Sequence, residues 1–294
     1  MTTIDNCPVC KSTQHHTHIE CLDDTVSRET FRISRCEKCS FLFTNNIPKK
    51  EELGLYYQSE DYISHSNSNN GFFNNLYKIV RTITLKKKLK LLGKKKGVLL
   101  ELGCGTGELL AACKKKGWNC IGVEPDGKAR LQASKNHNLD LHETIEKIKF
   151  DTNSIDRIML WHVLEHIPNL QETIKNFKRW LKEDGELLIA VPNHESWDAK
   201  HYQENWAAFD VPRHLYHFNK NSMKTLLNQH DLEIIKLKPM WFDAFYVAML
   251  SEKIKSGRKK ILKGAIIGLI SNLSALFGNQ EFSSHTFVVR HKKS

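Results

Sequence analysis

The stretch Val98-Leu99-Leu100-Glu101-Leu102-Gly103-Cys104-Gly105-Thr106-Gly107 passes from apolar residues to a glycine at every second position. An apolar run that ends just before glycines is typical of a buried parallel strand. The amphipathic segment that starts at Glu108 predicts a helix, whose N-terminus offers free N–H groups. Three closely spaced glycines let the backbone turn sharply and approach a ligand with no side chain between them. Such turns also occur for structural reasons alone, so the rest of the chain has to decide between a ligand cradle and a simple turn.

Strands and helices alternate along the chain after this stretch. The expected strands cover residues 98–102, 119–123, 139–142, 156–160, 186–191, 232–237 and 286–290, and the expected helices cover residues 71–92, 108–113, 128–135 and 168–181. This alternation predicts an α/β fold with a doubly wound, Rossmann-like sheet of seven strands. In such a sheet the ligand lies at the carboxyl ends of the strands.

Glu124 lies at the end of the second expected strand, 17 residues beyond Gly107. A carboxylate at this position can accept hydrogen bonds from both hydroxyls of a ribose. Pro125-Asp126-Gly127 then predicts a turn ahead of the next helix. The glycine stretch and Glu124 together favour the ligand cradle over the simple turn.

The N-terminal segment carries two C-x-x-C pairs, Cys7/Cys10 and Cys36/Cys39, separated by 25 residues. Two such knuckles can direct four thiolates at one point and form a tetrahedral site suited to zinc. Residues 30–35 alternate like a hairpin strand. The spacing therefore predicts a small zinc ribbon over residues 1–47 with a structural role, because four ligands leave no open position. The alternatives are two unrelated pairs of buried cysteines, or a site in which one ligand is replaced by Cys21, His15, His16 or His18.

The composition of the 294-residue chain is ordinary for a globular protein, with 40% hydrophobic and 26% charged residues. The polar N-terminus does not resemble an export signal, so we expect a cytoplasmic protein with reduced cysteines. The net charge is +11 and is concentrated in residues 86–96, 253–263 and 290–293. Such clusters can bind phosphate-rich partners or anionic lipid, but solvated helix faces are the favoured explanation.

Five ordered segments, at residues 101–107, 123–126, 154–156, 161–167 and 181–189, closely resemble the class I S-adenosylmethionine-dependent methyltransferases. The likeness covers roughly residues 90–238. The glycines follow G-x-G-x-G, whereas a dehydrogenase loop follows G-x-G-x-x-G. The resemblance implies S-adenosylmethionine (SAM) as cosubstrate, with the glycines against its methionine part and Glu124 on its ribose. The binding residues that it implies are Glu101, Gly103, Cys104, Gly105, Gly107, Glu124, Pro125, Thr144, Ile145, Leu160, Trp161 and His162.

This resemblance divides the chain into three parts. The ribbon, residues 1–47, is followed by a linker, lid and lead-in helix over residues 48–92, and the methyltransferase domain covers residues 93–294. We expect residues 64–70, which are rich in serine and asparagine, to form a loop or lid. Residues 193–219 are too aromatic and too rich in histidine for a simple connector, so we expect them to form the acceptor-binding lid.

Methyl transfer often needs a base that removes a proton from the acceptor. The candidates lie after the fourth and fifth strands and are His162, Glu165, His166 and His214. Residues 210–218 resemble a stretch in methyltransferases that modify surface polysaccharides and sugars, which favours His214. The lid residues expected to contact the acceptor are Trp197, Tyr202, Trp206, Asp210, Arg213 and Tyr216. Arg213 can hold an acceptor phosphate or carboxylate; the alternative is that these residues only pin the lid to the sheet.

The expected function is methyl transfer from SAM to a small acceptor such as a sugar, a nucleotide sugar or a lipid-linked glycan. The combination of ribbon and fold is similar to the C-methyltransferases of deoxysugar nucleotides. One alternative is RNA methylation, which the positive charge favours and the lack of aromatic residues among the basic ones disfavours. A second alternative is a non-catalytic zinc-ribbon adaptor, which the intact glycines and Glu124 disfavour.

Residues 240–280 read as a helical insertion that contains an apolar run over 261–277. Lys263 and Asn272 inside the run make it a poor membrane span. The run can lie on a membrane surface at the inner face, with the basic residues of 253–263 beside it. The alternative is a helix that packs on its own domain or on a second subunit.

Overall fold

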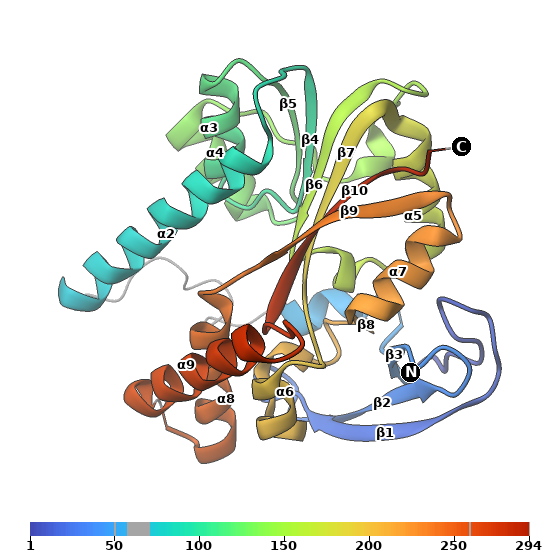
Figure 1. Cartoon of the computed structure of the whole chain (residues 1–294), viewed down its shortest axis with the longest axis vertical. Helices are drawn as coiled ribbons and strands as arrows, with labels where there is room; N and C mark the ends of the chain where they lie inside the picture. The colour runs from blue at the N-terminus through green and yellow to red at the C-terminus, as the bar shows by residue number, and fades with distance from the viewer. Residues whose placement is uncertain (50, 58–70, 259, 294) are drawn as a thin grey trace.

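A computed structural model describes residues 1–49, 51–57, 71–258 and 260–293 of the chain. The expected loop at residues 64–70 lies outside these described residues. The described part contains a large mixed sheet and a smaller antiparallel sheet that lies at its edge (Figure 1).

The large sheet contains six strands in the order β5-β4-β6-β7-β10-β9. Their bounds are β4 Val98–Leu102, β5 Asn119–Val123, β6 Ile155–Trp161, β7 Leu181–Pro192, β9 Leu232–Pro239 and β10 Ser284–His291. The first four are mutually parallel, and β10 is antiparallel to both β7 and β9. The carboxyl ends of β4, β5 and β6 therefore meet at one edge, as the alternation of elements predicts.

The prediction of a strand at residues 139–142 is wrong, and the sheet has six strands where seven were expected. Among the described residues this segment is reduced to one parallel bridge between His142 and Val123. Leu139 and Leu141 turn inward and pack near the glycine loop instead of extending a ladder. A second difference is the start of β7 at Leu181, five residues before the expected strand, since Leu181 already pairs with Ile155.

Helices cover both faces of the large sheet. Figure 1 shows α2 (Gly71–Leu91), α3 (Glu108–Lys115) and α4 (Gly127–His137) on one face and α5 (Leu170–Trp180) and α7 (Lys220–Asn228) on the other. Helix α5 buries Leu170, Ile174, Phe177 and Trp180, which recur at helical spacing and face the sheet. These helices make a doubly wound, Rossmann-like fold, as expected.

The smaller sheet contains β1 (His15–Leu22), β2 (Thr30–Cys36), β3 (Leu42–Asn45) and β8 (Tyr216–His217). Strand β8 comes from the segment that we expected to be a lid, and it pairs with β3 through Leu42 and Phe43. The N-terminal sheet thus includes a strand from residues 216–217, more than 170 positions further along the chain than β3. Short 3-10 turns complete this region, at Leu53–Tyr57, Ile145–Lys147, Leu164–His166, Gln203–Asn205 and Ala207–Phe209.

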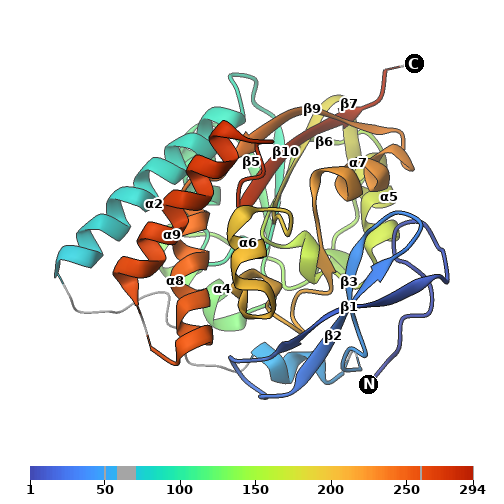
Figure 2. The ribbon, with the colours of Figure 1, turned by 60° about the horizontal axis from the view of Figure 1, so that its bottom comes forward.

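The insertion forms a helical hairpin of α8 (Asp243–Ser256) and α9 (Ile261–Phe277), and the short α6 (Trp197–Tyr202) packs against it. Figure 2 shows α6, α8 and α9 together on one side of the molecule. Among the described residues, no helix combines the length and the apolar character needed to cross a membrane.

Candidate active site

The glycine loop lies at the carboxyl end of β4, between that strand and α3. Gly103, Gly105 and Gly107 have φ angles of 65°, 53° and 77°, a region that side chains rarely tolerate. A Cβ on Gly103 would lie 2.4 Å from Val163 Cγ2, whereas a Cβ on Gly105 would meet no described atom within 4 Å. Packing therefore requires Gly103, and the backbone at Gly105 faces open space that a ligand can enter.

Glu124 joins the glycine loop to the end of β5. Its Oε2 accepts a hydrogen bond from the Gly105 N–H at 2.7 Å, and its Oε1 accepts one from the Asp126 N–H at 3.0 Å. The carboxylate is partly exposed and still has lone pairs available. The structure thus brings together the two features from which the sequence predicts a ribose-binding site.

Beneath the loop, two buried polar atoms have no partner within the described ranges. They are Glu101 Oε2 and Trp161 Nε1. Burial raises the pKa of Glu101 to about 8, although the charge of Lys88 opposes the shift. The Lys88 ammonium reaches this place from α2 and lies 4.2 Å from the centre of the Trp161 ring. Unpartnered buried acceptors and donors are costly, and a polar ligand that brings a donor to Glu101 and an acceptor to Trp161 would satisfy them.

His162 follows β6 and has a φ of 56°, which directs its ring toward two carboxylates. Its Nε2 lies 3.0 Å from Asp243 Oδ2 and its Nδ1 lies 3.5 Å from Glu165 Oε1. Burial opposes the charged ring, but Asp243 and Glu165 outweigh burial and raise the pKa of His162 to about 10. An imidazolium at neutral pH does not accept a proton, so this environment does not suit the expected role of a base.

A second group of side chains surrounds Glu165, which is fully buried. One ligand atom each of Glu165, His166 and His214 lies within 4.8 Å of the others. The Nδ1 atoms of the two rings bond to backbone carbonyls, His166 to Arg213 O at 3.0 Å and His214 to Ala208 O at 2.9 Å. Because a carbonyl accepts, each Nδ1 carries the proton and each Nε2 keeps its lone pair.

His166 and His214 differ in their surroundings. Burial, together with the neighbouring His214, lowers the pKa of His166 to about 4, so this ring stays neutral. The Tyr57 hydroxyl lies 3.1 Å from His166 Nδ1 and adds a contact from the linker. The two rings meet edge to face with their centres 4.6 Å apart. Of the four candidate bases, His214 has its Nε2 at 3.9 Å from Asp210 Oδ2 and lies beside the buried carboxylate of Glu165.

Of the other residues that the resemblance assigns to SAM, some are buried and some are exposed to solvent. Leu160 is fully buried, so only its backbone is available at the end of β6, and Cys104 is also buried. Burial raises the pKa of the Cys104 thiol, which keeps it neutral. Pro125 is exposed, and Thr144 and Ile145 are partly exposed beside a 3-10 turn. Lys88 and Asp243 were not predicted, because no local pattern links them to the glycine loop.

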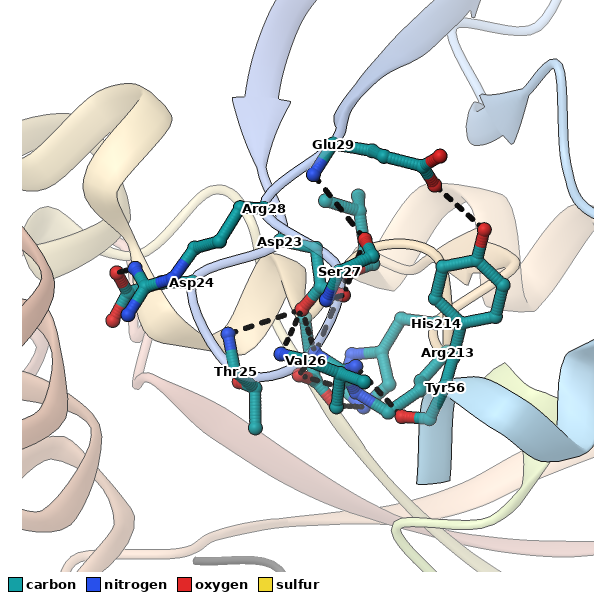
Figure 3. A network of polar contacts seen from close by, with 12 residues as sticks. Asp23, Asp24, Thr25, Val26, Ser27, Arg28, Glu29, Tyr56, Arg213 and His214 are labelled. Carbon is teal, nitrogen blue, oxygen red and sulfur yellow. Dashed lines mark hydrogen bonds and ion pairs between the residues drawn. The ribbon is translucent and has the colours of Figure 1, made fainter. Parts of the chain in front are cut away.

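Arg213 does not face an open acceptor site. Its side chain is 1% exposed, and its guanidinium donates to Asp23 Oδ1 at 2.9 Å, to Asp210 Oδ1 at 2.7 Å and to Tyr56 O at 2.9 Å (Figure 3). Asp23 also accepts from the backbone of Thr25, Val26 and Ser27. Burial alone would raise the pKa of Asp23, but the bonds from Arg213 and Ser27 hold it below its ordinary value. These contacts support the pinning alternative for Arg213 and Asp210.

The aromatic residues of the segment are mostly part of the core. Tyr202, Trp206 and Tyr216 are buried, and they pack with residues of the small sheet and of α8. Trp206 Nε1 donates to Asp198 at 2.8 Å, Tyr202 OH donates to Glu252 at 3.1 Å and Tyr216 OH donates to Pro168 O at 2.5 Å. Trp197 is partly exposed and stacks on His201. Most of residues 193–219 therefore join the two sheets, and His214 is the member whose ring lies beside Glu165 and His166.

We expect Arg213→Ala to destabilise the fold by about 3–5 kcal/mol, because it leaves the carboxylate of Asp23 buried without its partner. Urea unfolding of the purified protein measures this change. Arg28→Ala is the matched control, since it removes the exposed ion pair with Asp24 in the same turn; it should cost about 1 kcal/mol or less. Equal stability of the two variants would show that the buried network contributes little.

The four knuckle cysteines converge as the sequence predicts. One sulfur each of Cys7, Cys10, Cys36 and Cys39 lies within 4.8 Å of the others. The shortest separations are 3.5 Å for Cys7–Cys39 and 3.4 Å for Cys10–Cys36, far longer than the ~2.0 Å of a disulfide. Burial raises the pKa of Cys7 to about 11 when no cation balances the thiolates. Four free thiols in this arrangement suit a zinc ion. The alternative ligands Cys21, His15, His16 and His18 are not part of the cluster.

Comparison with known proteins identifies the family. Residues 78–237, more than half of the chain, match the methyltransferase domain family. An uncharacterised protein of Methanocaldococcus jannaschii is 25% identical over 215 residues, which cover 71% of this chain and 78% of that protein. The ubiquinone biosynthesis O-methyltransferase of Glaesserella parasuis is 34% identical over 114 residues, which cover 35% of this chain and about half, 47%, of that enzyme.

Solved structures share the fold. A SAM-dependent methyltransferase of Thermotoga maritima superposes with a TM-score of 0.51 at 20% identity, covering 75% of this chain and 97% of that one. One from Archaeoglobus fulgidus superposes with a TM-score of 0.50 at 17% identity, covering 74% and 99%. With the family match over residues 78–237, the glycine loop and Glu124 at the sheet edge, the chain belongs to the methyltransferase domain family, and its fold is the Rossmann-like fold of SAM-dependent methyltransferases.

Proposed function

We propose that this protein transfers a methyl group from SAM to a hydroxyl or similar group of a small acceptor, namely a sugar, a nucleotide sugar or a lipid-linked glycan. The observation that carries the proposal is the position of Glu165, His166 and His214 beside His162, which follows the carboxyl end of β6. A base and a buried carboxylate thus lie next to the edge of the sheet at which the family binds SAM.

The residues around the glycine loop suit SAM in three respects. The open space at Gly105 leaves room for the methionine part, and Glu124 offers a carboxylate for the ribose hydroxyls. Glu101 supplies a buried acceptor without a partner among the described residues, which suits the positive charge of the methionine ammonium. When bound, SAM supplies an electrophilic methyl group, so the protein has to orient the acceptor and manage its proton.

We assign the proton-accepting role to His214. The Ala208 carbonyl holds the proton on Nδ1, which leaves Nε2 as the atom that takes the acceptor proton. The resulting imidazolium is stabilised by the carboxylate of Glu165, whose ligand atom lies within 4.8 Å. His162 already carries a positive charge at neutral pH and keeps Glu165 and Asp243 in place.

We also propose that Cys7, Cys10, Cys36 and Cys39 hold one structural zinc ion. The buried, disulfide-free cluster supports this role, and four protein ligands leave no position for a substrate. The ion would hold the turns that start β1 and end β2. Since β8 pairs with β3 of the same sheet, the zinc site also supports the segment that carries His214.

The function is tested by incubating the full chain with labelled SAM and separate pools of nucleotide sugars, lipid extract and RNA. We expect label in the nucleotide-sugar or lipid pool, and at least about 100-fold less of it when His214 is replaced by asparagine. Label that appears in RNA alone would contradict the proposed acceptor class. The absence of label in every pool, with intact SAM binding, would favour a non-catalytic adaptor.

Glu124→Ala should weaken SAM binding by about 1–3 kcal/mol, or roughly 5- to 150-fold in Kd, because the charged hydrogen bonds to the ribose are lost. Isothermal calorimetry with the full chain measures this effect. Glu183→Ala is the control, since Glu183 is exposed near the start of β7, at the opposite edge of the sheet. An unchanged Kd for Glu124→Ala would mean that the ribose does not lie at the end of β5.

A further inference from the structure

Helix α9 places its large apolar side chains on the outside of the molecule. The residues that face α8 and α6 are small or polar for the most part, and the buried ones are Gly264, Ile267, Gly268, Ser271, Asn272 and Ala275. The exposed side chains are large and apolar, with 39–83% of each accessible, and they are Ile261, Leu262, Ile266, Leu269, Ile270, Leu273, Leu276 and Phe277. This arrangement is the reverse of the usual amphipathic helix of a globular protein, which buries its apolar side.

The inward face of α9 is fixed by specific contacts. A Cβ on Gly264 would lie 2.7 Å from Met249 Cα, and one on Gly268 would lie 2.7 Å from Phe245 Cα, so the two helices touch backbone to backbone. Ser271 Oγ donates to Asp198 Oδ1 at 2.6 Å, and Asn272 Nδ2 donates to Trp241 O at 2.8 Å. Rotation of α9 to bury its apolar side would break all of these contacts. Its exposed face is therefore a built feature of the fold.

Positive charge adjoins the apolar face. Residues 253–280 contain six lysines or arginines and no aspartate or glutamate. Lys255, Arg258 and Lys260 are exposed where α8 leads into α9, and no acid pairs with them within the described ranges. Lys263 is half-exposed and pairs with Glu252 from the same hairpin. A contiguous apolar surface beside a cluster of cations has the two features by which helices hold to anionic lipid.

We propose that the outer face of α9 lies in the interface of an anionic lipid membrane, with Lys255, Arg258 and Lys260 on the headgroups. At 1.5 Å per residue the 17-residue helix is about 26 Å long, and its inward face is bonded to the protein, so it lies in the membrane plane. The charge favours lipid over a second copy of the chain. A second copy would present the same positive cluster, whereas an anionic leaflet neutralises it.

The hairpin that carries this face begins at the candidate active site. Asp243, the first residue of α8, lies 3.0 Å from His162. Figure 2 shows α8 and α9 running side by side, and the two helices pack along their length. Membrane attachment through α9 would bring the site close to acceptors that are carried by lipid. The attachment itself does not depend on the proposed reaction.

Vesicle sedimentation of the full chain tests the proposal. Vesicles of phosphatidylcholine with 30% phosphatidylglycerol should bind the protein at least about tenfold more tightly than phosphatidylcholine alone, and salt should weaken the binding. The double variant Ile270→Glu/Leu273→Glu should lower the binding at least about tenfold, because it places charge in the apolar face. Leu131→Glu on α4 is the matched control, since Leu131 is 64% exposed on another surface, and it should bind as the natural chain does.

Two results would overturn the proposal. One is equal sedimentation of the natural chain and the double variant. The other is a dimer in lipid-free solution that the double variant converts to a monomer, without binding of the natural chain to vesicles, which would assign the face to a second copy. The SAM affinity of the double variant, measured by calorimetry, should equal that of the natural chain; this readout separates failure of membrane binding from failure of the fold or of the proposed function.

Discussion

Cys36→Ser should remove the bound zinc and unfold the N-terminal sheet, with a loss of roughly 10 kcal/mol of metal-linked folding energy. The effect should be large because Cys36 is fully buried and ends β2, the strand that pairs with both β1 and β3. Metal analysis should find about one zinc per natural chain and none in the variant. Thermal unfolding should show early melting of the small sheet.

The same variant should lose methyl transfer while it still binds SAM. The reason is the pairing of Leu42 and Phe43 in β3 with His217 and Tyr216 in β8, which begins two residues after His214. The glycine loop and Glu124 belong to the large sheet and do not depend on this pairing. Cys21→Ser is the control, because Cys21 is buried in β1 but lies outside the cluster of four. A chain without metal that melts as the zinc-loaded chain does would refute a structural zinc site.

His214→Asn should lower turnover by about 100- to 10,000-fold, the usual contribution of a general base. Asparagine can still donate to the Ala208 carbonyl as His214 Nδ1 does, but it lacks the Nε2 lone pair. The variant should therefore fold and bind SAM normally. Single-turnover assays with labelled SAM and the accepting pool measure the loss.

Two further readouts distinguish a base from a structural residue. The pH profile of turnover should differ between the natural chain and His214→Asn, because only the natural chain has the ring nitrogen that can take the acceptor proton. Free imidazole should restore part of the activity of the variant, because it can occupy the space of the missing ring. Loss of activity in parallel with loss of SAM binding and of thermal stability would assign His214 to the fold alone.

The predictions for Arg213 and His214 differ although the two residues are adjacent. Arg213 is bonded to Asp23, which is 190 positions away in the chain, and to Asp210 and Tyr56, so its charge is balanced within the protein. His214 has one backbone hydrogen bond through Nδ1, and its Nε2 lies 3.9 Å from Asp210 Oδ2, with Glu165 nearby. From the sequence both residues appear equally suited to an acceptor site, since both lie in the same polar and aromatic segment.

The sequence by itself determined the local features of this protein. The glycines Gly103, Gly105 and Gly107 at the end of a strand permit a tight turn with left-handed residues, which the structure contains. Glu124 at the next strand end lies beside this turn, because adjacent parallel strands end at the same edge. The spacing of the four cysteines was likewise enough to bring their sulfurs together. In each case the sequence pattern that predicts the feature is either a short run of residues or a pair of identical motifs.

Features that depend on contacts between distant segments of the chain were decided by the tertiary structure alone. The expected strand at residues 139–142 has the composition of a strand, but it forms one bridge with β5 because its leucines pack inward. Residues 216–217 became a strand of the ribbon sheet because β3 offered an unpaired edge. Lys88 and Asp243 have no local signal, since their roles arise from contacts between elements that the chain separates widely. The apolar run of α9 was visible in the sequence, but only its packing on α8 and α6 decided that its large side chains face outward.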